Sequence, residues 1–318
     1  MLNWAFSGVG LVILLLAGDM LVKGAVNLSL RLGIPAMIIS LTIVAFGTSA
    51  PELLISLNAT LSGASGIAVG NVVGSNIANI LLVLGVPAML FALDTSKCDT
   101  RASYFFMLFA TAVFIGLAFT GGFGLWQGGV LLAFLAYYLW INFTDAQGHR
   151  GEGDLCNGDS ASELEEADPD LATWKIAVFL ILGLAGLPLG ADLLVDNASE
   201  IAYRFGISDA VIGLTLIAVG TSLPELATTV ASAFRKQADV ALGNVIGSNI
   251  FNLLGIIGVT AMVDYVAVAP MFLRFDLWVM LASSLVLIPF VLYKVHLTRL
   301  WGVALTALYL SYVHFILA

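Results

Sequence analysis

The chain contains a series of apolar stretches of about 20 residues or more, the length of helix that crosses the hydrocarbon layer of a membrane. These stretches are continuous rather than alternating, so the strands of a membrane β-barrel do not account for them. Only 10% of the 318 residues are charged, whereas soluble domains carry about 25%. Because backbone inside a bilayer must satisfy its own hydrogen bonds, the sequence predicts an all-α integral membrane protein.

Ten spans are predicted, and the first is not a cleavable signal. It lacks a basic start and contains Asp19 and Lys23, so we interpret it as a membrane span. The predicted spans cover residues 4–30, 34–61, 65–92, 102–120, 124–143, 173–203, 207–233, 239–264, 270–293 and 299–317.

The positions of Lys and Arg predict the orientation of these spans. Odd-numbered spans end on one side of the membrane, which collects nine basic residues against two on the other side. The nine are Arg31, Lys97, Arg101, Arg150, Lys175, Arg235, Lys236, Lys294 and Arg299, and the two are Arg204 and Arg274. The positive-inside rule predicts that the first side is cytosolic and that both termini lie outside. The expected location is the inner membrane of a cell. Cys98 and Cys156 then lie on or near the reducing side, so no disulfide is expected.

The net charge of −9 is concentrated between two halves of the chain. Residues 145–170 contain nine acids against one base, Arg150. The acids are Asp145, Glu152, Asp154, Asp159, Glu163, Glu165, Glu166, Asp168 and Asp170. Mixed with Gly, Ser and Asn, they predict a solvated cytosolic linker, 145–172, between halves 1–144 and 173–318. A regulatory cation site in the linker is an alternative, although the acids lack the spacing of an EF-hand loop.

The two halves share a repeated sequence. Residues 42–85 align without a gap with residues 215–258, at an offset of 173, and 19 of the 44 aligned positions are identical. Each half contains five predicted spans, and an odd number inserts the second copy upside down relative to the first. The sequence therefore predicts two inverted five-helix repeats, with discontinuous helices at the centre and a binding site near the membrane midplane.

A proline and a glutamate interrupt the second span. In the stretch AFGTSAPELLIS, Pro51 cannot donate a hydrogen bond to the carbonyl of Gly47, and its ring clashes there. We expect two half-helices joined by a short unwound segment, with the hydroxyls of Thr48 and Ser49 at the break and Glu52 in the first turn that follows. The same parts recur in the second half as Gly220, Thr221, Ser222, Pro224 and Glu225.

A second motif follows the first in each half. GNVVGSNIAN, residues 70–79, recurs as GNVIGSNIFN. Its glycines are four residues apart and allow neighbouring helices to approach closely. Ser75 and Asn79 are also four apart and share a helix face, as do Ser248 and Asn252. Each face offers a hydroxyl and an amide oxygen toward the glutamates.

These residues predict a cation site built from oxygen atoms. The repeats contain no His or Cys, and oxygen ligands suit hard cations such as Na⁺, Ca²⁺ or Mg²⁺ rather than zinc or copper. Glu52 and Glu225 supply two negative charges, which neutralise one Ca²⁺. Mg²⁺ requires a tight octahedron and sheds water reluctantly, so a flexible cage of broken helices favours Ca²⁺. Intramembrane acids repeated in matching motifs indicate a function rather than a simple kink.

Other polar residues leave two interpretations open. Four asparagines are either ligands or partners in interhelical hydrogen bonds: Asn71, Asn76, Asn244 and Asn249. Asp19 and Asp192 are expected to be structural. Asp19 precedes Lys23 by four residues and can pair with it, whereas Asp196 replaces Lys23 in the second half.

The paired motifs GTSAPEL and GNVVGSNIAN, with GTSLPEL and GNVIGSNIFN, resemble the two α-repeats of the sodium/calcium exchanger family, within the cation/calcium antiporter superfamily. The chain looks like a prokaryotic-type member. In that family the glutamates of the first motif bind Ca²⁺ and Na⁺. The resemblance implies Glu52 and Glu225 as central ligands, with the carbonyls of Thr48 and Thr221 at the Ca²⁺ site. It implies flanking Na⁺ positions formed by Ser49, Ser222, Ser75, Ser248 and the carbonyls of Ala45 and Ala218.

One departure from the family pattern concerns charge. Some members carry an acid at the position of Asn252, whereas here both Asn79 and Asn252 are amides. The site lacks a possible third charge, which puts potassium dependence in doubt and leaves the Na⁺ stoichiometry open. The short acidic linker also lacks room for the large calcium-sensing domains of animal exchangers.

The expected function is secondary antiport rather than catalysis, with cytosolic Ca²⁺ exchanged for external Na⁺. No cofactor, nucleic acid or obligatory protein partner is implied, and the partners are the ions and the lipid bilayer. The main alternative is a cation/proton antiporter of the same architecture, in which Glu52 or Glu225 takes a proton (H⁺), and a cation channel is a further one. A hydrolase is disfavoured because His149, His296 and His314 lie outside both repeats.

Overall fold

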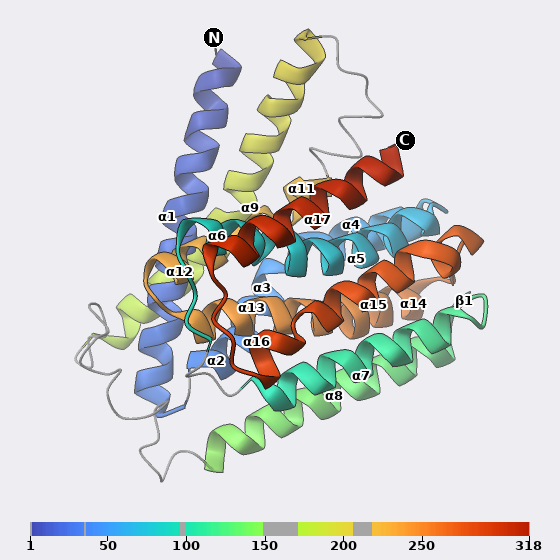
Figure 1. Ribbon diagram of the computed structural model, residues 1–318, viewed down its shortest axis with the longest axis horizontal. Helices are drawn as coiled ribbons and strands as arrows, with labels where there is room; N and C mark the ends of the chain where they lie inside the picture. The colour runs from blue at the N-terminus through green and yellow to red at the C-terminus, as the bar shows by residue number, and fades with distance from the viewer. Residues whose placement is uncertain (1, 35, 96–99, 149–170, 206–217, 318) are drawn as a thin grey trace.

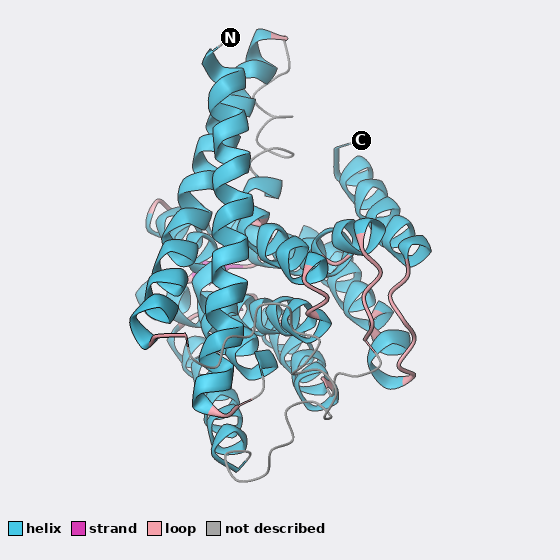
Figure 2. Cartoon of the chain, turned by 90° about the vertical axis from the view of Figure 1, so that its left-hand side faces the viewer, coloured by secondary structure: helices cyan, strands magenta, loops and turns pink. Residues whose placement is uncertain are grey.

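The computed structural model describes residues 2–34, 36–95, 100–148, 171–205 and 218–317. Cys98, Cys156, most of the acidic linker and the first part of the predicted span 207–233 lie outside these ranges. Figure 2 shows that the described chain is built almost entirely from helices, as its long apolar runs require.

The two halves contain similar series of elements, in which η marks a π-helical turn. The first half contains α1 (Leu2–Leu32), α2 (Ala36–Ile39), η1 (Ser40–Val44), α3 (Ala45–Thr48), α4 (Ala50–Leu61), α5 (Ser65–Ala78), η2 (Asn79–Val83), α6 (Gly85–Leu90), α7 (Arg101–Ala118), β1 (Gly122–Phe123) and α8 (Leu125–Gly148). The second half contains α9 (Thr173–Arg204), α11 (Ala218–Thr221), α12 (Leu223–Phe234), α13 (Ala238–Ile250), η4 (Phe251–Ile256), α14 (Ile257–Val263), β2 (Val266–Ala267), η5 (Phe272–Asp276), α15 (Leu277–Val286), α16 (Ile288–Leu292) and α17 (Arg299–Leu317).

Seven of the described helices are long and apolar enough to cross a membrane, or eight if the bent run from α2 to α4 is one span. These eight coincide with eight of the ten stretches predicted from hydropathy. The described part of the seventh predicted span forms α11 and α12, and α17 is a helix of 19 residues at the place of the tenth. The structure thus agrees with the all-helical prediction, and it supports seven or eight spans by length and composition.

Helices α1 and α9 lie side by side and run antiparallel (Figure 1). Gly10 of α1 faces Leu194 of α9, and a Cβ at Gly10 would lie 2.7 Å from the backbone nitrogen of Leu194. Further along α1, Leu21 faces Gly183, where a Cβ would lie 2.7 Å from the Cβ of Leu21. Residue numbers rise along one helix as they fall along the other. Glycine is required at these two crossings because any side chain would push the helices apart.

Two short backbone ties connect the halves. β1 pairs with β2 in antiparallel fashion, with Phe123 opposite Val266. Leu93 pairs with Leu297, and their N–H groups donate to each other's carbonyls at 3.0 and 3.1 Å. The offset of the repeat relates Leu93 to Val266, so the two ties occupy equivalent places. Each joins the end of a third span to the connection between the last two spans of the other half.

The core surrounds the third span of each half. The stretches Ser65–Leu90 and Ala238–Val263 are the most buried of the candidate spans, and α13 lies in the middle of the molecule in Figure 1. Large apolar side chains on outer helices, such as Trp140 and Leu300, are exposed. Such a surface is expected where helices contact lipid rather than water.

Candidate ion-binding site

The bend in the second span occurs at a single residue. Ser49 separates α3 from α4, and the helices on its two sides differ in direction by 42°. The N–H of Leu53 donates to the carbonyl of Ser49 at 3.2 Å, so helical hydrogen bonding resumes immediately. The unwound segment that the sequence predicted is therefore only one residue long. Pro51 lies in the first turn of α4, where a missing N–H costs no helical bond. Ser222 separates α11 from α12 in the same way.

Helices α4 and α12 place the two glutamates inside the protein. Glu52 and Glu225 are each 1% exposed and lie in the first turns of these helices, where the helix dipole favours negative charge. Ser49 of the first half donates its hydroxyl to Oε1 of Glu225 at 3.2 Å. Oε2 of each glutamate has no hydrogen-bond partner within the described chain. A buried carboxylate oxygen without a partner is costly, and a cation ligand removes that cost.

The hydroxyl of Thr48 also connects the two halves. Its Oγ1 lies 3.5 Å from Oγ of Ser248 and donates to Oδ1 of Asn244 at 3.4 Å. The carbonyl of Ala45 accepts from Oγ1 of Thr48 at 3.3 Å and from the N–H of Ser49 at 3.1 Å. The Thr48 hydroxyl has a single hydrogen to share between this carbonyl and Asn244. When it donates to Asn244, the Ala45 carbonyl keeps only the N–H of Ser49 as a donor and has a lone pair available for an ion.

Asn79 and Asn252 lie within the π-helical turns η2 and η4. Nδ2 of Asn79 donates to Oδ1 of Asn249 at 3.1 Å, whereas Oδ1 of Asn79 has no partner in the part of the chain that the structure describes. Among the described residues, neither polar atom of the Asn252 side chain has a partner. π-Helical turns are frequent at functional sites. Buried amide oxygens that accept no hydrogen bond from the described residues fit the chemistry of a Na⁺ or Ca²⁺ ligand.

Asn71 and Asn244 fix the glutamate-bearing helices in the same manner. Nδ2 of Asn71 donates to the carbonyl of the glutamate in its half at 3.1 Å and to Oγ of Ser56 at 2.9 Å. Nδ2 of Asn244 makes the equivalent bonds at 3.4 Å and, to Oγ1 of Thr229, at 3.3 Å. The structure thus gives these two asparagines interhelical hydrogen bonds. Sequence reasoning missed Ser56 and Thr229, although both are hydroxyl residues at equivalent positions of the repeat.

The remaining predicted residues lie on the same elements. Ser222 is buried, and its Oγ has no partner within the described chain. Ser75 is buried on α5, and Thr221 and Ala218 belong to α11. Asn76 donates to a carbonyl of its own helix at 2.7 Å. Of these residues, Ala218, Thr221 and Ser222 lie at or beside the break between α11 and α12.

The donor set is unusual for a metal centre. Across the described ranges, no group of three or more His, Cys, Asp or Glu side chains comes together to hold a metal ion. Two carboxylates are instead combined with amide and hydroxyl oxygens. Such a set suits hard cations that accept neutral oxygen ligands.

Known proteins share this sequence and architecture. The sequence model of the family described as "Sodium/calcium exchanger protein" matches residues 2–144 and 175–318. The chain is 35% identical to the sodium/calcium exchanger MaX1 of Methanosarcina acetivorans, over 98% of this chain and 97% of that relative. It is 26% identical to the Ca(2+)/H(+) antiporter ChaA of Bacillus subtilis, over 64% and 60% of the two chains.

A solved structure of the sodium-calcium exchanger NCX_Mj, soaked with Na⁺ and Sr²⁺, matches this fold with a TM-score of 0.79. The two chains are 32% identical, and the match covers 99% of this chain and 98% of that one. The protein is therefore an integral, multi-pass membrane protein and belongs to the sodium/calcium exchanger family.

Proposed function

We propose that the protein is a secondary active antiporter that exchanges Ca²⁺ for Na⁺, binding the two ions in turn at one site. The observation that carries this proposal is the pair of buried glutamates, Glu52 and Glu225, whose Oε2 atoms have no hydrogen-bond partner among the described residues. Together they cancel the charge of one Ca²⁺. Because Na⁺ would use the same oxygen atoms, occupancy by one ion excludes full occupancy by the other, and this exclusion couples the two fluxes.

The proposed ligands are those predicted from the motifs. Glu52 and Glu225 would bind both ions, and the other donors would supply neutral oxygens. These other donors are Thr48, Thr221, Ser49, Ser222, Ser75, Ser248, Asn79, Asn252, Ala45 and Ala218.

The proposal includes ten spans arranged as two inverted repeats. Antiparallel packing of α1 and α9 supports this arrangement, as do the two equivalent backbone ties. The repeats would be 1–144 and 173–318, joined by the linker 145–172. The distribution of basic residues supports a cytosolic linker, with both termini on the outer side of the cell membrane.

Calcium/proton exchange is the second candidate, because the chain is related to a Ca²⁺/H⁺ antiporter. A carboxylate can carry a proton in place of an ion. However, Asn79 and Asn252 contribute neutral amides, and an amide oxygen can bind Na⁺ but does not take up a proton near neutral pH. The longer match to MaX1 also favours Na⁺.

Flux measurements on purified protein in vesicles distinguish these candidates. Uptake of radioactive calcium is measured with either a Na⁺ gradient or a pH gradient, and protein-free vesicles serve as the control. We expect uptake that saturates with Ca²⁺ and depends on the Na⁺ gradient. Uptake that is driven by the pH gradient and does not respond to the Na⁺ gradient would refute sodium exchange. Uptake that never saturates and needs no counter-ion would indicate a channel.

A further inference from the structure

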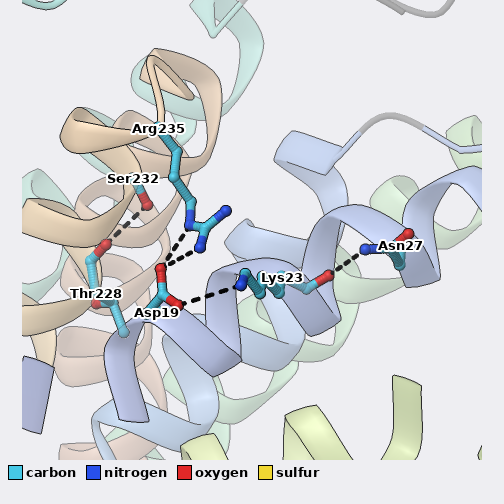
Figure 3. Close-up of polar contacts among 6 residues, drawn as sticks. All are labelled: Asp19, Lys23, Asn27, Thr228, Ser232 and Arg235. Atoms are coloured by element: carbon cyan, nitrogen blue, oxygen red, sulfur yellow. Dashed lines mark hydrogen bonds and ion pairs between the residues drawn. The ribbon is translucent and has the colours of Figure 1, made fainter. Parts of the chain in front are cut away.

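Three charged side chains meet where α1 crosses α12 (Figure 3). Nε of Arg235, which follows α12, donates to Oδ1 of Asp19 at 2.7 Å, and Nη2 of Arg235 donates to the same oxygen. Oδ2 of Asp19 lies 3.6 Å from Nζ of Lys23, which confirms the pair expected from their spacing. The Arg235 and Asp19 side chains are 15% and 33% exposed, so the ion pair is partly shielded from solvent.

The backbones of α1 and α12 also approach closely at this place. A Cβ at Gly18 would lie 2.8 Å from the carbonyl oxygen of Ala227 and 3.2 Å from the nitrogen of Thr228. Thr228 in turn donates its hydroxyl to the carbonyl of Glu225 at 2.9 Å. Helix α1 therefore contacts the helix that carries Glu225 within one turn of that glutamate.

The equivalent place in the other half lacks this arrangement. With the offset of 173, Asp192 takes the place of the acid, Asp196 that of Lys23, and Ser62 that of Arg235. Asp192 and Asp196 are exposed on α9. In the described part of the chain, α1 packs along α12, whereas α9 does not pack along α4. The conformation is therefore closed at one of the two equivalent places and not at the other.

We propose that Asp19, Lys23 and Arg235 form an ionic latch that favours one of the two conformations between which the antiporter alternates. Two identical halves would give two conformations of equal free energy. A contact available at only one of two equivalent places stabilises the conformation that contains it. Positive-inside orientation places the latch toward the cytosol. The inference rests on the proposed function, because it requires alternation between two conformations.

The latch is tested by measuring two equivalent distances with spin labels. The labels are attached to cysteines in a background carrying Cys98→Ser and Cys156→Ser, with the protein in lipid nanodiscs. One pair replaces Leu16 and Phe234, across the latch, and the other replaces Leu189 and Leu61, at the equivalent place. All four leucine and phenylalanine side chains are exposed. Distance distributions are recorded with Na⁺ alone and with Ca²⁺ alone.

In the labelled protein with its native Asp19, Lys23 and Arg235, we expect mainly the short distance between the labels at positions 16 and 234. Arg235→Gln and Asp19→Asn should each raise the ratio of long to short distances by about five- to thirtyfold, the effect of one to two kcal/mol on an equilibrium. Ser62→Arg should create a base opposite Asp192 and shorten the distance between the labels at positions 189 and 61. The shorter distance in the Ser62→Arg variant would come from an added contact, so it does not depend on removing any native contact.

A matched control removes an ion pair that lies within one helix. Arg204 is paired with Glu200 of α9 at 3.3 Å, and both side chains are largely exposed. Arg204→Gln should leave both distance distributions unchanged. Thermal unfolding and size-exclusion chromatography of each variant establish that it is folded before its distances are compared.

Two results would overturn the latch in different ways. If the unmodified protein shows two populations that neither Arg235→Gln nor Ser62→Arg changes, the three charges do not set the equilibrium. If the unmodified protein and the Arg235→Gln, Asp19→Asn and Ser62→Arg variants all give one and the same distribution under every ion condition, alternation itself is wrong, and the latch with it. The first result leaves the proposed exchange of Ca²⁺ for Na⁺ intact, whereas the second removes its mechanism.

Discussion

Replacing Glu225 with glutamine should nearly abolish Ca²⁺ binding without unfolding the protein. Glutamine has the same shape, and its Oε1 can still accept the hydrogen bond from Ser49 that Glu225 accepts at 3.2 Å. The new amide group would replace Oε2, which has no partner among the described residues, so no native hydrogen bond is lost. The change therefore removes one negative charge and little else.

The magnitude follows from the loss of charge balance. With only Glu52 ionised, a bound Ca²⁺ leaves one uncompensated positive charge in a site whose two carboxylates are each 1% exposed. Removing one partner of a buried charge pair costs about 3–5 kcal/mol. At about 1.4 kcal/mol per tenfold, Ca²⁺ affinity should fall by roughly a hundred- to a few thousandfold.

Titration calorimetry of the detergent-purified protein measures this affinity, and thermal unfolding reports on the fold. Glu200→Gln is the matched control, because Glu200 is an exposed glutamate on α9 and should not affect Ca²⁺ binding. Folded Glu225→Gln protein with near-normal Ca²⁺ affinity and uptake would show that Glu225 is not a required ligand. The two-glutamate site would then have to be abandoned.

Three further predictions concern protons, charge and packing. Ca²⁺ binding should weaken as the pH falls, because protons compete for the same carboxylate oxygens; calorimetry over a pH series checks this, and constant affinity would argue against carboxylate ligands. Asn252→Asp should tighten Ca²⁺ binding and slow exchange, because it adds a third acid among the donors. Calcium flux into vesicles measures both the affinity and the rate of exchange, and values equal to those of the unmodified protein would place Asn252 outside the site. Gly183→Val should destabilise the protein by about 1–3 kcal/mol, because its Cβ would lie 2.7 Å from that of Leu21. Gly8→Val is the control, because no other element of the described chain lies within 4 Å of a Cβ added there, and equal melting temperatures for the two variants would refute the packing argument.

Sequence reasoning was most informative where chemistry repeats along the chain. The length of the apolar stretches predicted the helices, because a bilayer leaves few alternatives for the backbone. The same glutamate motif at residues 52 and 225 pointed to one buried site, and the structure buries both side chains. Their roles as ion ligands stay a prediction, to be tested as described above.

Features that depend on contacts between distant residues were not predicted. The pairing of Arg235 with Asp19 joins residues 216 positions apart, and hydropathy carries no signal for it. The π-helical turns that contain Asn79 and Asn252 are a change in hydrogen-bond register, which residue type alone does not specify. The break at Ser49 was predicted in position but not in extent, because Pro51 takes its place in the first turn of α4.

The two backbone ties limit the mechanical freedom of the transporter. Swinging one complete half away from the other as a rigid body would break the hydrogen bonds between Leu93 and Leu297 and separate Phe123 from Val266 at the same time. Helices α1 and α9 take part in neither tie, and they are packed tightly against each other. Their displacement as a pair would leave both ties intact. Most of the chain would then act as a stationary frame, so lipids around α7, α8 and α17 would be disturbed little by each cycle, while those beside α1 and α9 would have to rearrange.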